Sequence, residues 1–280
     1  MITKNACVSI VIPTFNESKV IGKLLESLNK QTYNNIETIL VDDGSKDNTI
    51  KIAKKYKVKI FKRKHAERSI QRNFGAKKSI GKYLMFIDAD MEFSPKVVES
   101  CVKEIESSKN IGGIVIKEES IANSFWGKVK AFERSFYNLE GDESVESARF
   151  FPRSVFEEVG GYDETITGPE DWDLPEMIKE KGYKLARVEA IIYHYERVPN
   201  PLKLARKKYY YALKASRYFK KHNTKLISSK TIYFLRPVFY RNWVRLLRHP
   251  VLSCAMVFMF ILEIFGGGFG YLRGKYIQNN

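Results

Sequence analysis

The fold is decided at residues 8–17, which read Val8-Ser9-Ile10-Val11-Ile12-Pro13-Thr14-Phe15-Asn16-Glu17. The first five of these residues form a short apolar run, and Pro13 closes it. A short run of this kind predicts a strand that is buried on both faces. The polar residues after it predict a loop at the carboxyl end of the strand, which is where ligands bind in sheets of parallel strands.

The same pattern continues along the chain. Ile36 to Val41 is a second apolar run, and Asp42-Asp43-Gly44-Ser45 closes it. We expect helices at about residues 18–30, 48–56, 69–79 and 95–107, and further strands at about residues 58–61, 83–87 and 111–117. Strands that alternate with helices predict an α/β fold with a parallel sheet.

The positive charge gathers near the C-terminal end. The formal charge is +16, and the part from Pro201 onward carries 16 Lys or Arg but a single acid, Glu263. Residues 204–221 interleave cations with aromatic side chains, which predicts a basic amphipathic helix, and residues 251–265 are almost wholly apolar. Fifteen helical residues rise about 22 Å, short of a hydrocarbon core of about 30 Å, although residues 266–272 bring the length into range. Spanning and partial insertion therefore both remain open.

The cysteines and the first residues indicate a cytoplasmic protein. Cys7, Cys101 and Cys254 are widely spaced and form no CxxC pair, so they predict neither a zinc site nor a disulfide framework. Met1 to Ala6 carry no basic flank followed by an apolar run, so we expect no secretory signal peptide. The excess of cations before Val251 favours the cytoplasmic face of a membrane.

An acidic triplet follows one of the predicted strands. Asp88-Ala89-Asp90 comes directly after residues 83–87, so both carboxylates are expected at the same edge of the sheet. Mg²⁺ and Mn²⁺ prefer oxygen ligands, and in nucleotide sites they bind a few carboxylates together with substrate phosphates. A lone DxD triplet is a weak signal, because such triplets also occur by chance in loops. Its place after a buried strand is what makes a metal site plausible.

Three segments together resemble the successive signatures of family 2 glycosyltransferases. They are residues 8–17, 41–49 and 81–90. The resemblance covers roughly the first 195 residues and implies the GT-A fold, a nucleotide-binding αβα sandwich with a mostly parallel central sheet. It implies that a nucleotide sugar is bound by Pro13, Thr14, Phe15, Glu17, Asp43, Arg72, Asp88, Ala89 and Asp90.

Some of these residues have a second interpretation. A carboxylate at Asp43 can accept hydrogen bonds from a uracil N3 or a ribose hydroxyl, but Asp42 and Asp43 can also cap a turn before a helix. Arg72 lies in residues 67–75, which resemble the family's segment near the nucleotide. Its guanidinium can pair with a diphosphate oxygen or can face solvent on a helix.

A second motif resembles the acceptor side of the same family. It reads Thr167-Gly168-Pro169-Glu170-Asp171-Trp172-Asp173. The family places its catalytic base here, and an inverting transfer needs a carboxylate that takes the proton of the acceptor hydroxyl. We assign this role to Asp171, with Glu170 orienting either Asp171 or the acceptor. Capping of a helix N-terminus is the competing interpretation, because helix N-termini attract acids.

His194 ends the apolar run Ala190 to Tyr193. Several GT-A enzymes take a third metal ligand from a His at a comparable place, and an imidazole suits Mn²⁺. The expected metal ligands are therefore Asp90, Asp88 and His194, although a lone His beside a strand is often structural. We expect the acceptor wall around residues 126–137 and at Arg149-Phe150-Phe151.

The leading hypothesis is an inverting glycosyltransferase that depends on Mn²⁺ or Mg²⁺. It takes a nucleotide sugar, a UDP-sugar rather than a GDP-sugar, and acts on a hydroxyl of a lipid-linked or other glycan acceptor. Residues 1–200 form the catalytic domain, and residues 201–280 bind a membrane surface.

Other functions fit the sequence less well. A dolichyl- or polyprenyl-phosphate sugar synthase needs no base at Asp171, because its acceptor is already an anion. A basic nucleic-acid-binding protein or a membrane scaffold is the alternative outside enzymes. Charge that is confined to a tail beside an apolar segment favours lipid over nucleic acid.

Overall fold

The computed structural model describes residues 6–137, 147–223, 228 and 231–279. By its contacts this part of the chain divides into two compact units, which we describe one at a time. The sheet unit holds the described residues up to Glu118, together with Ser147–Glu164 and Asp171–His194. The helical unit holds the described residues within Glu119–Glu146, Thr165–Glu170 and Tyr195–Asn280.

The sheet unit is built on one sheet. Within the described ranges this sheet has eight strands in the order β3-β2-β1-β4-β7-β6-β8-β5. The strands are β1 (Val8–Thr14), β2 (Ile36–Asp42), β3 (Lys59–Lys62), β4 (Tyr83–Phe86), β5 (Met91–Phe93), β6 (Ile111–Ile121), β7 (Ala148–Pro152) and β8 (Lys184–Tyr195).

The sequence predicted a mostly parallel sheet, and the structure has a parallel part and an antiparallel part. β1 pairs in parallel with β2 and with β4, and β2 pairs in parallel with β3. β7 is antiparallel to β4 and to β6, and β5 is antiparallel to β8. The regular alternation of apolar runs and helices stops after residue 117, and so the sequence indicated the parallel strands but not the antiparallel pairs. The α/β fold class is confirmed.

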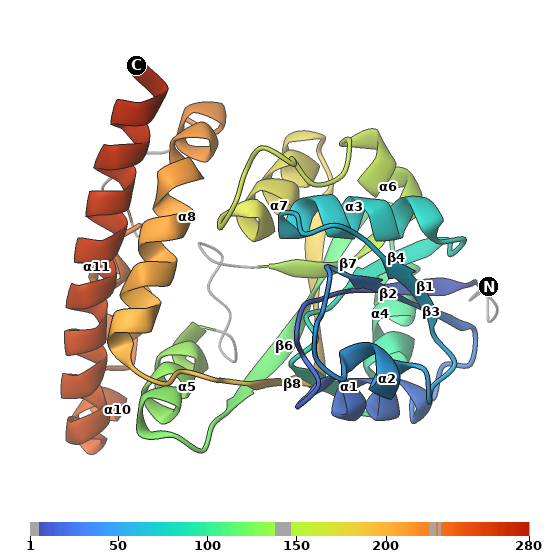
Figure 1. Ribbon diagram of the computed structural model, residues 1–280, viewed down its shortest axis with the longest axis horizontal. Helices are drawn as coiled ribbons and strands as arrows, with labels where there is room; N and C mark the ends of the chain where they lie inside the picture. The colour runs from blue at the N-terminus through green and yellow to red at the C-terminus, as the bar shows by residue number, and fades with distance from the viewer. Residues whose placement is uncertain (1–5, 138–146, 224–227, 229–230, 280) are drawn as a thin grey trace. The chain divides into compact units, whose positions relative to one another are not determined.

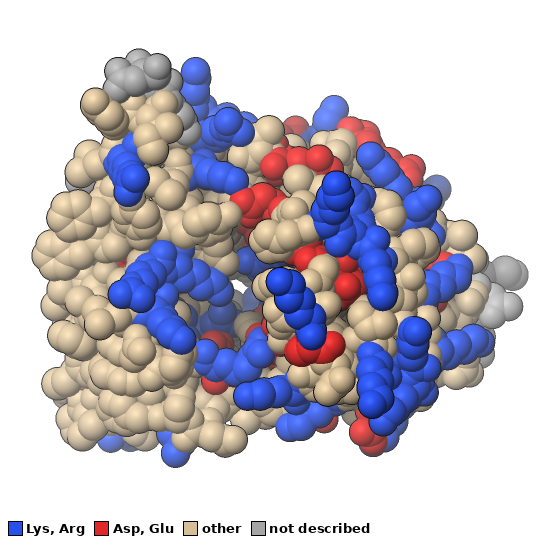
Figure 2. All heavy atoms as spheres, viewed as in Figure 1, with Lys and Arg blue, Asp and Glu red and all other residues tan. Residues whose placement is uncertain are grey.

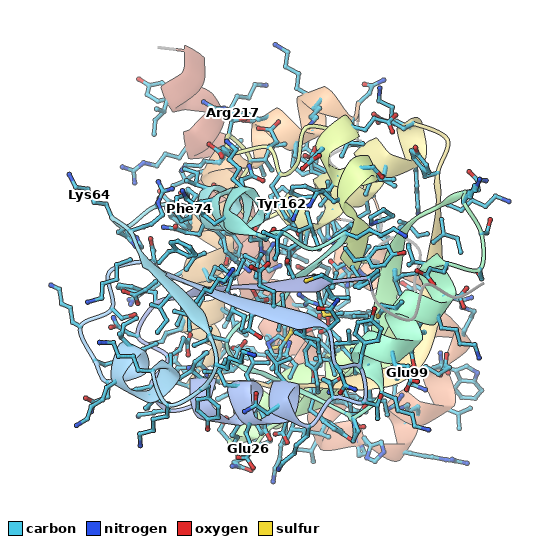
Figure 3. All side chains as sticks on the ribbon, turned by 90° about the vertical axis from the view of Figure 1, so that its right-hand side faces the viewer. Glu26, Lys64, Phe74, Glu99, Tyr162 and Arg217 are labelled. Carbon is cyan, nitrogen blue, oxygen red and sulfur yellow. The ribbon has the colours of Figure 1, made fainter. Side chains whose placement is uncertain are left out.

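Helices cover both faces of this sheet (Figure 1). α1 (Ile21–Asn29), α2 (Thr49–Ala53) and α4 (Val97–Ile105) pack on one face, and α3 (Arg68–Lys78), α6 (Arg153–Glu158) and α7 (Glu170–Glu180) pack on the other. Successive residues of a strand point to opposite faces, so Ile10 joins the first core and Val11 the second. In Figure 3, Glu26 on α1 and Phe74 on α3 accordingly lie on opposite sides of the sheet.

The helical unit has a core rich in aromatic side chains. Its helices are α5 (Phe125–Tyr137), α8 (Pro201–Lys221), η1 (Tyr233–Leu235), α9 (Pro237–Arg241), α10 (Trp243–Arg248) and α11 (Pro250–Asn279). Phe136 of α5 packs against Phe239 of α9, which packs against Phe260 of α11. The start of α8 is fixed locally, because the side chain of Asn200 accepts a hydrogen bond from the N–H of Lys203 and Pro201 occupies the first turn.

α11 is the helix that the apolar segment of the sequence predicted. In the part of the chain that the structure describes, it alone is long and apolar enough to cross a membrane, with a mean hydropathy of 2.0 over an 18-residue stretch within Pro250–Ile277. Length and composition do not by themselves distinguish a membrane helix from the buried helix of a soluble protein.

Candidate active site

Asp88 lies just beyond the carboxyl end of β4, in a cluster of guanidinium groups. Its Oδ1 is 3.1 Å from Nη2 of Arg72 and 4.0 Å from Nη1 of Arg68, and its Oδ2 is 3.7 Å from Nη1 of Arg149. Burial alone would raise the pKa of Asp88, but the three guanidinium groups, Arg72 first, outweigh burial and hold the pKa below its ordinary value. Asp88 is therefore ionised and already paired with cations.

Asp171, in the first turn of α7, is held by the same arginine. Its Oδ1 accepts a hydrogen bond of 2.5 Å from Nη1 of Arg72, whose side chain is only 1% exposed. Burial would raise the pKa of Asp171, but Arg72 and Arg68 lower it below the ordinary range. One buried guanidinium thus bridges Asp88 and Asp171, and it keeps Asp171 in the form that accepts a proton.

Asp90 and His194 meet because β5 pairs with β8. The register places Met91 opposite His194, and the Nε2 of His194 lies 3.6 Å from the Oδ1 of Asp90. The prediction of these two residues as metal ligands did not depend on this strand pairing. The antiparallel contact is what brings them together from positions far apart in the chain.

Glu118 of β6 completes a chain of charges that the sequence did not indicate. Its Oε2 lies 3.5 Å from the Nδ1 of His194, and its Oε1 accepts a hydrogen bond of 2.6 Å from the Nε of Arg149. Arg149 in turn faces Asp88. This chain of contacts, from Asp88 through Arg149, Glu118 and His194 to Asp90, therefore connects both aspartates of the triplet. The predicted strand stopped at residue 117, and so Glu118 carried no signal as a site residue.

The donor atoms near Asp90 fit a divalent cation. Ligand bonds to such ions are about 2.0 to 2.2 Å, so two ligands of one ion lie at a separation close to that of the Asp90 and His194 atoms. No group of three or more His, Cys, Asp or Glu within the described ranges is arranged to hold a metal ion. The residues present suit an ion that takes its other ligands from a diphosphate and water, as Mg²⁺ usually does.

The loops after β1 and β2 join at Asp43. The N–H of Asp43 donates a hydrogen bond of 2.8 Å to the carbonyl oxygen of Thr14. Its Oδ1 accepts hydrogen bonds from the N–H of Ala66, at 2.8 Å, and from the Nε2 of Gln71. Its Oδ2 lies 2.5 Å from the Nδ1 of His65. These partners come from another segment of the chain, so Asp43 does not act as a cap of its own turn.

Asp42 behaves differently from its neighbour. Its carboxylate accepts a hydrogen bond of 3.3 Å from the N–H of Ser45, which is the contact of a turn-capping aspartate.

Phe15 is 46% exposed and lies beside the ring of His65, at a centroid distance of 5.2 Å. An exposed ring next to a buried carboxylate is a suitable surface for a planar base.

The other predicted residues occupy varied positions. Pro13 is half-buried in β1, and the N–H of Glu17 donates to the Oγ1 of Thr49 at 2.8 Å. Ala89 packs its side chain in the core, so a ligand would meet only its backbone. Glu170, the first residue of α7, is 2% exposed.

The prediction of an acceptor wall was wrong for three aromatic residues, because their side chains are fully buried. Phe150 and Phe151 are 0% exposed and lie in the two cores of the sheet unit. Phe136 is also 0% exposed, in the core of the helical unit. None of these three rings can contact an acceptor.

Comparison with known proteins identifies relatives of this chain. A profile of the family described as glycosyl transferase family 2 matches residues 9–160. An uncharacterized glycosyltransferase of Haemophilus influenzae is 28% identical over 185 residues, which are 62% of this chain and 63% of that protein. The glycosyltransferase GlyG of Streptococcus pneumoniae is 30% identical over 128 residues, 42% of each chain. The chain thus spans less than two thirds of the length of these relatives.

Solved structures share the fold. The mannosyltransferase PcManGT of Pyrobaculum calidifontis, solved with GDP-Man and Mn²⁺, matches with a TM-score of 0.59 at 15% identity, over 97% of this chain and 74% of that one. TarS of S. aureus, residues 1–349 in complex with UDP, matches with a TM-score of 0.53 at 15% identity, over 98% and 92%. At these identities the likeness shows the fold alone, and it is the GT-A fold that the sequence motifs implied.

Proposed function

The chain belongs to glycosyl transferase family 2, and from this membership we propose that it moves a sugar from a nucleotide-sugar donor to an acceptor hydroxyl with inversion. One observation carries the proposal. A buried Arg72 bridges Asp88, beside the Asp90 and His194 pair, to Asp171. Groups suited to bind a metal diphosphate and a carboxylate suited to accept a proton therefore belong to one network.

We assign the following roles to the residues. Asp43 and the loop of Pro13, Thr14, Phe15 and Glu17 hold the base and ribose, and Arg72, Asp88 and the backbone at Ala89 lie along the donor. Asp90 and His194, with Asp88 through water, hold Mn²⁺ or Mg²⁺. When bound, the cation supplies positive charge that stabilises the leaving diphosphate.

Asp171 acts as the general base in this proposal. The acceptor oxygen forms its bond to the anomeric carbon while the bond from that carbon to the diphosphate breaks, and the hydroxyl proton passes to the Asp171 carboxylate. Glu170 orients the acceptor or Asp171. The lowered pKa of Asp171 supports the assignment, because the carboxylate stays unprotonated near neutral pH.

A UDP-sugar is the donor that we propose. The Asp43 carboxylate is an acceptor for the N3–H of uracil, and its position next to the exposed ring of Phe15 supports a base site there. Among proteins with this fold, one is solved with UDP and another with GDP-Man, so the fold does not select the donor.

We further propose that residues 1–200 carry the catalysis and that residues 201–280 attach the protein to the cytoplasmic face of a membrane, where the acceptor is lipid-linked. Support comes from the exposed apolar side chains of α11 together with the cations of α8 and α10. Two anchoring signals of this kind, apolar area and positive charge, act together on anionic membranes. We do not expect nucleic acid as a partner.

Calorimetry of the full chain with UDP, GDP and their sugars, each with and without Mn²⁺, tests the proposed function. We expect binding of UDP compounds that requires the cation, and slow release of UDP from a UDP-sugar. Failure of every nucleotide to bind would refute the glycosyltransferase proposal. Tight binding of GDP alone would refute the choice of donor.

A further inference from the structure

α11 is largely apolar in sequence, but its two faces differ. Met259, Phe260 and Glu263 are at most 3% exposed and pack inside the helical unit. Along the other side runs a continuous row of large apolar side chains between 41% and 71% exposed, which we call the apolar stripe: Phe258, Ile261, Phe265, Phe269, Leu272 and Tyr276. Their spacing of three or four residues keeps them on one side of the helix.

The packed face of α11 touches the backbone of α8. Gly266, Gly270 and Gly274 are one turn apart, and a Cβ on Gly270 would lie only 2.2 Å from the carbonyl oxygen of Tyr209. The other two glycines are similarly close to carbonyl oxygens one turn before and after it. Small residues at this spacing let two helix backbones approach directly. α8 and α11 lie side by side in Figure 1 and run in the same direction.

Buried ion pairs also hold the packed face of α11 against its neighbours. The Oε1 of Glu263 is 3.4 Å from the Nζ of Lys130 on α5, and its Oε2 is 3.7 Å from the Nζ of Lys208 on α8. A buried carboxylate is stable only with such partners. α11 therefore cannot leave α5 and α8 and turn this face to lipid.

α8 cannot enter the hydrocarbon with its partner. Six of its cationic side chains are exposed: Lys203, Arg206, Lys207, Arg217, Lys220 and Lys221. Lys and Arg are among the most unfavourable residues at the centre of a bilayer. If α11 crossed the membrane, the backbone contact at Gly266 to Gly274 would draw these charges into the hydrocarbon.

We infer that α8 and α11 lie together in the plane of an anionic membrane, with the apolar stripe in the outer part of the hydrocarbon and the cations of α8 among lipid phosphates. In Figure 2 the surface over α11 carries few Lys or Arg side chains. α10 adds Trp243, 59% exposed, and the exposed Arg248 next to the start of α11. Apolar rings flanked by cations are typical of helices that lie in the interface.

This inference rests on the proposed membrane association, and the first experiment separates the two. The full chain is sedimented with vesicles of phosphatidylcholine alone or mixed with phosphatidylglycerol. We expect binding to the mixed vesicles, and Phe269→Asp should reduce the partition at least about tenfold by placing a charge in the stripe. Ile80→Asp, an apolar side chain 75% exposed in the sheet unit, is the matched control and should bind like the wild type.

The second experiment distinguishes lying from spanning. In a Cys7→Ser, Cys254→Ser background, Arg248→Cys and Lys275→Cys mark the two ends of α11, and bound vesicles are treated with a membrane-impermeant maleimide. Labelling of both positions without detergent is the expected result. Protection of Lys275→Cys until detergent is added would show a spanning helix and overturn the in-plane arrangement.

Two other outcomes also count against the proposal. If no vesicle binds the wild type while it still binds nucleotide, the membrane association fails and the enzyme assignment survives. If Phe269→Asp leaves vesicle binding intact but converts a dimer to a monomer in solution, a second copy of the chain covers the stripe instead of lipid.

Discussion

The proposed chemistry depends on Arg72. A guanidinium that is 1% exposed donates to both Asp88 and Asp171, and it lowers the pKa of each against the opposing effect of burial. Because the planar fork of Arg has donors on both sides, it can hold two carboxylates at a fixed separation. The position of the proposed base thus depends on a residue of α3 that lies far from it in sequence.

Asp171→Asn should remove transfer and keep nucleotide binding. An amide cannot accept the hydroxyl proton, so we expect kcat to fall at least about 100-fold while the Kd for UDP with Mn²⁺ stays near that of the wild type. Glu180→Gln, an exposed acid of the same helix, is the control. Equal losses of binding and transfer would assign Asp171 to the donor site instead.

Arg72→Met should move the acid limb of the pH profile to higher pH. In the wild type the pKa of Asp171 is below its ordinary value, so the base form persists as pH falls and its protonation limits kcat/KM only under strongly acidic conditions. Without Arg72, burial and the charge of Asp88 both raise that pKa, and activity is lost at a higher pH. Arg72→Lys retains the charge and should shift the limb less. An unchanged limb in Arg72→Met would mean that Arg72 does not set the pKa of the base.

The sequence located some site residues and not others for a physical reason. Asp43, Asp88 and Asp90 follow buried strands, so the strand pattern alone placed them at one edge of the sheet. Glu118 contacts His194 only because distant strands pair in a particular register. Registers between remote strands are set by tertiary packing, and no local pattern records them.

At the scale of elements, Gly266, Gly270 and Gly274 of α11 form a specific packing surface and not a flexible segment. Gly270→Ala would place a methyl group against the backbone of Tyr209, which cannot move aside as a side chain can. We expect a loss of about 1 to 3 kcal/mol in the free energy of unfolding of the helical unit. Thermal unfolding followed by circular dichroism measures it.

Gly268→Ala is the matched control for that substitution. A Cβ on Gly268 meets nothing within 4 Å. Ala favours a helix over Gly by about 1 kcal/mol, so this variant should be slightly stabilised. Equal shifts of the two variants in the same direction would show that the helices do not touch at Gly270.

The elements also show where a sequence pattern stops being informative. Apolar runs separated by amphipathic helices predicted β1 to β4, and β1, β4 and the second half of β2 are buried. β5 has three residues, and β7 contains Phe150 and Phe151, which the sequence suggested as a wall and which instead fill two cores. Such short strands carry too little periodicity to be recognised.

For the whole molecule, the two units call for separate tests. The core of the helical unit includes Val129, Phe132 and Phe136 of α5, which packs against α9 and α11. Removal of the chain after Pro201 would expose this face of α5, so truncation would confuse a loss of membrane binding with misfolding. Single substitutions on the apolar stripe avoid that problem.

Phe269→Asp should separate turnover of the donor from use of a membrane acceptor. The substitution lies on the exposed face of α11 and leaves the sheet unit intact. We expect the variant to hydrolyse a UDP-sugar at the wild-type rate. Transfer to a polyprenyl-linked acceptor in vesicles should be at least about tenfold slower, because the enzyme no longer concentrates at the membrane surface. Unchanged transfer in vesicles would contradict a lipid-linked acceptor.

The makeup of the helical core has a consequence for how the protein is synthesised. Phe136 leaves the ribosome well before Phe260 of the same core, with more than a hundred residues between them. At ordinary rates of translation this delay is on the order of ten seconds. The apolar face of α5 therefore stays exposed in the nascent chain during that time. If a ribosome stalls before α11 is synthesised, residues 125–137 should be accessible to proteases and chaperones.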